Sequence, residues 1–150
     1  MKKRLMAGLL ISALCMSLTA CSGNSTAESD TSGSDKAEDQ KSYSISVILK
    51  TTASEYWGYV KAGVDAYAKD HPEHNISAKG PSSETAYDEQ QNMIETDLNS
   101  GAYDAFVISP LQPDLVKTLI SGQTAPIIAL DSKIEAPEVR SFVGTGNESA

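Results

Sequence analysis

The chain lacks most of what a thiol or metal-dependent enzyme would need. Its two cysteines, Cys15 and Cys21, both lie in the first 21 residues, so the rest of the chain has no thiolate nucleophile, no thiolate metal ligand and no disulfide. Only two histidines occur, His71 and His74, in the segment DHPEH. A proline between them and a helix-end setting indicate a solvated loop rather than a metal centre. We therefore expect no metal site and no cofactor.

Positive charge is also scarce. The formal net charge is −8, with 12 Lys and Arg residues against 20 Asp and Glu residues. Three of the basic residues lie in the first four positions, so the remainder of the chain is more acidic still. Such a surface repels a phosphate backbone, and no basic patch offsets it. We expect no nucleic-acid partner.

Long apolar runs are missing as well, since none reaches the roughly 18 residues that a membrane-spanning helix needs. Residues 5–18 are apolar and follow the basic segment 1–4, an asymmetry typical of a secretory signal peptide. They run into the sequence LTAC, which resembles the lipobox of bacterial lipoproteins, where cleavage exposes a cysteine whose sulfur carries a diacylglycerol. We predict a signal peptide at 1–20 and a lipid on Cys21. The alternative is an ordinary signal peptide with a chance cysteine.

Residues 22–41 contain no large apolar side chain and are rich in Ser, Gly, Asp and Glu. Such a composition buries too little surface to offset the entropy cost of ordering. We predict that residues 21–42 form a disordered acidic tether. It would hold a folded domain, residues 43–150, away from the membrane.

In the folded region, short apolar runs alternate with helical patterns. The predicted strands cover about 45–49, 75–79, 105–108, 126–130 and 139–143, and helices lie between the first four of them. The run AFVI is continuously apolar, as expected of a strand that is covered on both faces. This order predicts an α/β fold with a doubly wound parallel sheet.

The first strand leads through a polar loop into the first helix, which begins near residues 52–54 and ends before Pro72. Ligands of such sheets bind outside the carboxyl ends of the strands, where this loop lies. Helical spacing predicts a buried stripe on this helix, formed by Tyr56, Val60, Gly63, Val64, Tyr67 and Ala68. Tyr56 is therefore either a core or a ligand residue, whereas Trp57 lies off the stripe and is expected to face a ligand.

Four segments carry a resemblance to a known family: EYWGYVKAGVDAYAK, DAFVISP, APIIALDS and FVGTGNESA. In this order and spacing they resemble the type 1 periplasmic binding proteins, the sugar-binding proteins of ABC transporters related to ribose-binding protein. The resemblance covers residues 44–150. It implies two similar α/β lobes that close on a ligand like a clamshell. Only the N-terminal lobe is present, so we expect the chain to be truncated before a second lobe.

The resemblance also implies a sugar site. Positions that match Ser54, Tyr56 and Trp57 face the ligand from the first loop, where aromatic rings stack on the C–H face of a sugar. The position that matches Asp131 accepts hydrogen bonds from sugar hydroxyls, and such bonds to a charged group are strong.

Three further residues are expected at the same edge of the sheet, outside the carboxyl ends of the strands. Ser109 and Asn147 follow the third and fifth predicted strands. Ser132 stands where several sugar-binding members have an arginine, and Gly146 stands where an aspartate is common. Both differences bear on the identity of the ligand rather than on its class.

The leading hypothesis is a non-enzymatic solute-binding lipoprotein that captures a sugar or similar polyol and delivers it to an ABC permease. It would be lipid-anchored in the cell envelope, on the extracytoplasmic face of a bacterial membrane. The alternative is a sensor subunit of the same fold that presents its ligand to a membrane histidine kinase or chemoreceptor. A secreted α/β enzyme is disfavoured by the missing nucleophile and metal motifs.

The fragment Gly144-x-Gly146 is only a weak sign of a dinucleotide-binding site. It would need a third glycine where Ser149 stands to complete the fingerprint.

Overall fold

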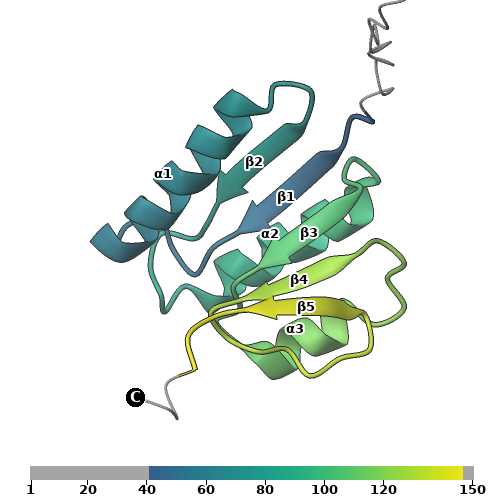
Figure 1. The fold of residues 1–150 in the computed structure, drawn as a ribbon. Coiled ribbons are helices and arrows are strands. Elements are labelled where there is room, and N and C mark those ends of the chain that lie inside the picture. Colours follow the sequence, from purple (N-terminus) through teal and green to yellow (C-terminus); the bar gives the residue numbers. More distant parts are fainter. Residues whose placement is uncertain (1–40, 147–150) are drawn as a thin grey trace, which may run out of the picture. The chain divides into compact units, whose positions relative to one another are not determined.

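Residues 41–146, the part of the chain that the computed structural model describes, form five strands and three helices (Figure 1). In chain order the elements are β1 (Ser44–Ile48), α1 (Glu55–Asp70), β2 (Asn75–Lys79), α2 (Tyr87–Ser100), β3 (Ala105–Ile108), α3 (Pro113–Leu119), β4 (Ile127–Leu130) and β5 (Val139–Val143). The predicted α/β class is confirmed. None of the helices in this part of the chain is both long and apolar enough to cross a bilayer.

The five strands form one parallel sheet in the order β2-β1-β3-β4-β5. The chain moves from β1 outward to β2 and then returns past β1 to β3, so the direction of winding reverses at β1. Because all strands are parallel, all their carboxyl ends lie along one edge of the sheet. In α/β sheets this edge, next to the reversal, is where ligands bind.

The two faces of the sheet are covered to different extents. The face under α2 and α3 holds the larger core, whose buried members are Ile48, Ile94, Phe106, Ile108, Val116, Ile120, Ile127, Ala129 and Ile134. Figure 1 shows these two helices behind the sheet, with α1 next to β2. The face under α1 buries only Val47, Leu49 and Trp57 fully. An apolar groove of about 380 Å³ remains there, lined by residues of α1 and of β1 to β3.

The predicted buried stripe of α1 is wrong at Tyr56, Gly63 and Tyr67, which are exposed. Tyr56 is 60% exposed and Tyr67 is 53% exposed, whereas Trp57 is buried at 3%. The helix begins at Glu55 and presents Trp57, Val60 and Val64 to the sheet, a spacing of three and four residues. Trp57 therefore belongs to the core.

Helix α2 begins at Tyr87, and the residues between β2 and this helix form a loop with turns. The carboxylate of Glu89 accepts hydrogen bonds from the backbone N–H and the hydroxyl of Ser82, at 2.9 and 2.7 Å. These bonds hold the loop between β2 and α2 close to the edge where the strands end.

Candidate functional site

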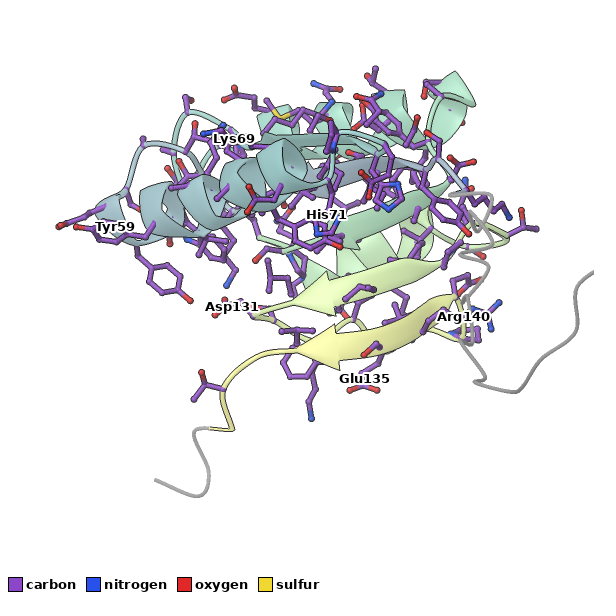
Figure 2. The ribbon with its side chains drawn as sticks, turned by 45° about the horizontal axis from the view of Figure 1, so that its top comes forward. Tyr59, Lys69, His71, Asp131, Glu135 and Arg140 are labelled. Atoms are coloured by element: carbon purple, nitrogen blue, oxygen red, sulfur yellow. The ribbon has the colours of Figure 1, made fainter. Side chains whose placement is uncertain are left out.

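Asp131 follows the last residue of β4 and lies at the carboxyl edge of the sheet, where Figure 2 labels it. Its φ of 63° makes it the one non-glycine residue with a positive φ among residues 41–146. The N–H of Ser132 bonds the carbonyl of Leu130 at 2.7 Å, which closes a tight turn around Asp131. A left-handed non-glycine residue costs about 1–3 kcal/mol, and such strain gathers at functional sites. The turn therefore marks Asp131 as a candidate site residue.

Lys50, the second residue after β1, reaches Asp131 across the end of β3. Its Nζ lies 2.6 Å from Asp131 Oδ2 and 2.7 Å from Ser132 Oγ. The side chains of Lys50 and Asp131 are 19% and 37% exposed. Within residues 41–146, Asp131 Oδ1 has no hydrogen-bond partner, so an acceptor remains open beside a held ammonium. We call Lys50, Asp131 and Ser132 the rim cluster.

Of the adjacent aromatic residues Tyr56 and Trp57, the first has an exposed ring and the second has a buried ring. Tyr56 is largely exposed, and its ring meets the Trp57 ring edge to face at 5.1 Å and 83°. Trp57 Nε1 donates to Glu84 Oε1 at 3.1 Å, and Lys50 Nζ lies 5.9 Å from the Trp57 ring centroid. The buried ring of Trp57 therefore contacts both Tyr56 and Lys50, while the ring of Tyr56 remains largely exposed.

Two of the predicted site residues have covered hydroxyls. Ser54 stands at the N-cap position of α1, yet its side chain makes no capping hydrogen bond. Ser109, the residue after β3, is fully buried. The Oγ atoms of both are buried and have no partner in the part of the chain that the structure describes. Buried hydroxyls are rarely left unpaired. These two therefore hold unused hydrogen-bonding capacity behind the exposed rim.

The structure thus brings Asp131 and Ser132 together through Lys50, and links the exposed Tyr56 to Lys50 only through the buried ring of Trp57. Asn147 lies outside the described residues, as do Cys21, the signal peptide at 1–20 and most of the tether. Sequence reasoning missed Lys50. The signal was available, because Lys50 follows β1 at the same edge as Asp131 follows β4.

The residues that could suggest other chemistry lie elsewhere or do not cluster. In residues 41–146 no group of three or more His, Cys, Asp or Glu side chains could hold a metal ion. His71 and His74 precede β2 and so lie toward the opposite edge of the sheet. The pKa of Glu73 is lowered, first by a backbone hydrogen bond and then by the bond from His71 at 3.0 Å. This cluster has no connection to the rim cluster.

A doubly wound parallel sheet with a polar rim at its carboxyl edge defines the class of fold, an α/β lobe. Residues 45–150 match the family described as "Periplasmic binding protein domain", and the chain belongs to this family. Among curated proteins, none matches the chain.

Solved structures of the family are similar to the chain. A carbohydrate transporter solute-binding protein from Agrobacterium radiobacter, in complex with D-arabinose, is 29% identical with a TM-score of 0.63; the match covers 73% of this chain and 37% of that one. An ABC transporter solute-binding protein from Agrobacterium vitis, with bound D-fucose, is 30% identical with a TM-score of 0.61, covering 71% and 38%.

The complex of the TorS sensor domain with TorT shares the fold alone, at 18% identity, with a TM-score of 0.59 and coverage of 69% and 37%. The chain therefore spans less than two-fifths of the length of each of these three structures.

Proposed function

We propose that the protein is a non-enzymatic, extracytoplasmic solute-binding protein that captures a sugar or similar polyol for an ABC importer. The observation that carries this proposal is the rim cluster, whose Lys50 lies over the Trp57 ring against which the exposed Tyr56 ring packs. Asp131 is an acceptor, Lys50 and Ser132 are donors, and a hydroxyl of a polyol both donates and accepts. One ligand hydroxyl could therefore bond to Asp131 Oδ1 while its neighbour accepts from Lys50.

The charges of the rim favour a neutral ligand. The ammonium of Lys50 already lies on the carboxylate of Asp131, so the pair carries no net charge. An acidic ligand would compete with Asp131 for the ammonium, and a cationic ligand would displace it. The flat face of Tyr56 suits the C–H face of a sugar ring. The sugars named for the two Agrobacterium proteins support this class.

The rim is open to solvent, so the proposed ligand would receive only part of its contacts from this lobe. The match with this chain covers less than two-fifths of each similar structure. We infer that a second lobe closes over Tyr56 and Asp131 in the whole protein. Binding by the 150-residue chain alone is then expected to be weak.

Anchoring by a lipid on Cys21 belongs to the same proposal. Its support is the sequence LTAC after an apolar segment. Two acyl chains would hold the protein stably at the membrane, whereas one would not. Mass spectrometry of the mature N-terminus tests the anchor: we expect a diacylglyceryl-modified Cys21, and an unmodified cysteine would contradict it.

A sensor subunit is the second candidate, because the same fold occurs in the complex of TorS with TorT. Such a protein would present its ligand to a membrane kinase rather than to a permease. The genes beside this one separate the two candidates. A permease and an ATPase favour import, whereas an adjacent sensor kinase favours signalling.

Calorimetry tests the binding function. Neutral sugars, among them D-arabinose, D-fucose and D-allose, would be titrated into this chain and into a version that includes a C-terminal lobe. We expect heat of binding from the longer protein only. Micromolar or tighter binding by the short chain would contradict the proposal that a second lobe supplies part of the contacts. Turnover of a sugar by either protein would contradict a non-enzymatic role.

A further inference from the structure

Gln90, near the start of α2, is buried at 2% and uses its whole carboxamide. Its Nε2 donates to the carbonyls of Leu49 and Ser109, both at 3.0 Å. Its Oε1 accepts from the N–H of Leu111 at 2.8 Å. One side chain therefore bonds the chain segments that leave β1 and β3, directly behind the rim cluster.

Beyond Ser109, no direct hydrogen bond joins these two segments within residues 41–146. The last hydrogen bond between them runs from the N–H of Ser109 to the carbonyl of Ile48 at 2.8 Å. The next two bonds of a parallel ladder, from Lys50 N–H to the Ser109 carbonyl and from Leu111 N–H to the Lys50 carbonyl, are not formed. Without Gln90, the carbonyls of Leu49 and Ser109 and the N–H of Leu111 would lack these partners. The carboxamide of Gln90 bonds to all three groups.

The carbonyl of Leu49 belongs to the peptide group that enters Lys50. A hydrogen bond to that carbonyl fixes the plane of the peptide and so the direction in which the Lys50 side chain leaves the backbone. On the far side, Thr51 is held by a bond from its hydroxyl to the carbonyl of Pro81 at 2.9 Å. Lys50 is thus fixed from both sides.

We propose that Gln90 is a positioning residue of the ligand site: its carboxamide orients Lys50 so that the ammonium lies on Asp131. The relevance of this role to a ligand rests on the proposed function, but the role itself is a property of the free protein. A purely structural Gln90 would hold α2 on the sheet without affecting Lys50.

The sharpest test compares Gln90→Met with Gln91→Met. Methionine has nearly the length of glutamine and no amide. Gln91 is the next residue on the same helix, and its amide bonds only the carboxylate of Glu95, at 2.9 Å. Crystal structures of both variants would give the distance between Lys50 Nζ and Asp131 Oδ2. We expect Gln91→Met to keep the 2.6 Å contact. Gln90→Met should lose it, with a separation beyond the roughly 4 Å limit of an ion pair.

Trp57 is the only tryptophan of the chain and gives a second readout in solution. Lys50 Nζ lies 5.9 Å from its ring, so Lys50→Met should change its emission in the wild-type and Gln91→Met backgrounds. In the Gln90→Met background the same change should be lost, because the ammonium has already left the ring.

A Gln90→Met protein that keeps the 2.6 Å contact and shows only a lower melting temperature would overturn the proposal. If that variant does not fold, Gln90→Asn takes its place, since it keeps the amide but is one methylene shorter. The same distance then decides: loss of the contact supports the role, and retention overturns it. Neither readout uses a sugar, so failure here is separate from failure of the proposed function.

Discussion

Two lysine–aspartate pairs of equal length stand in opposite settings in this molecule. Lys50 and Asp131 meet at the rim, and Lys79 and Asp97 meet between β2 and α2, each at 2.6 Å. Asp131 is 37% exposed with one oxygen open, whereas Asp97 is 4% exposed. The second oxygen of Asp97 accepts from the buried hydroxyl of Ser46 at 2.5 Å.

The difference between the pairs lies in burial and in unused hydrogen-bonding capacity, not in chemistry. A buried aspartate with both oxygens filled by the protein contributes to folding and offers nothing to a ligand. An exposed aspartate with a free oxygen, next to a held ammonium, contributes little to folding because water screens it. We therefore assign Asp97 to stability and propose Asp131 for binding.

Removal of the buried aspartate should have the largest effect. Asp97→Ala leaves the hydroxyl of Ser46 without its partner and Lys79 without its counter-charge. Because Lys79 is about one-third exposed and can turn to water, the loss should be about 2–3 kcal/mol, less than the roughly 3–5 kcal/mol for a fully buried pair. Chemical denaturation measures it. In the same experiment Asp131→Ala should cost less than about 1 kcal/mol, and equal losses would abolish the distinction between the pairs.

Removal of the charge at the rim should affect binding instead. In the protein with its second lobe, Asp131→Asn loses a hydrogen bond to a charged acceptor, worth about 1.5–3 kcal/mol. Affinity for the sugar should fall by roughly ten-fold to a hundred-fold while the midpoint of unfolding hardly moves. Calorimetry on the variant measures the fall. Unchanged affinity would remove Asp131 from the site.

The open aromatic ring should have a smaller effect. Tyr56→Ala removes a face that contributes about 0.5–1.5 kcal/mol, so affinity should fall by roughly two-fold to ten-fold. Tyr59→Ala is the matched control, because Tyr59 lies on the same helix, is 69% exposed and bonds only Glu55, at 2.7 Å. The two variants should unfold alike. Equal losses of affinity would show that the effect is not local to the rim.

The smallest effect concerns pH and the loop between β2 and α2. The pKa of Glu89 is lowered by the bonds from the backbone N–H and hydroxyl of Ser82. A carboxyl whose folded pKa is lowered stabilises the protein above its unfolded pKa, and this contribution is lost as pH falls below 4.5 and through the lowered value. Denaturation at neutral pH and at about pH 3 should show a loss of stability. The loss should be slightly smaller in Glu89→Gln, and an identical pH dependence would contradict the assignment.

Much of the fold could be predicted from the sequence because its signals are local. Short apolar runs and helical spacing identified the strands and helices, and the resemblance of four segments gave the family that the comparison confirms. The exposure of Tyr56 and Trp57 could not be predicted in the same way. They are adjacent on a helix, so a shift of one residue in the buried face exchanges their roles.

The rim cluster shows a different limit. Lys50 and Asp131 are 81 residues apart in the chain, and β3 lies between their strands. Their contact follows only when the strand order is known. Asn147 and the lipid on Cys21 remain predictions, since both lie outside the described residues.

Chemical-shift mapping by NMR tests the central contrast most directly. A neutral sugar that binds the protein with its second lobe, taken from the calorimetric panel, would be titrated while the amides of this lobe are followed. We predict large shifts at Lys50, Tyr56 and Asp131, and none at Lys79 or Asp97. Shifts that centre on Lys79 and Asp97, with the rim unmoved, would contradict the account.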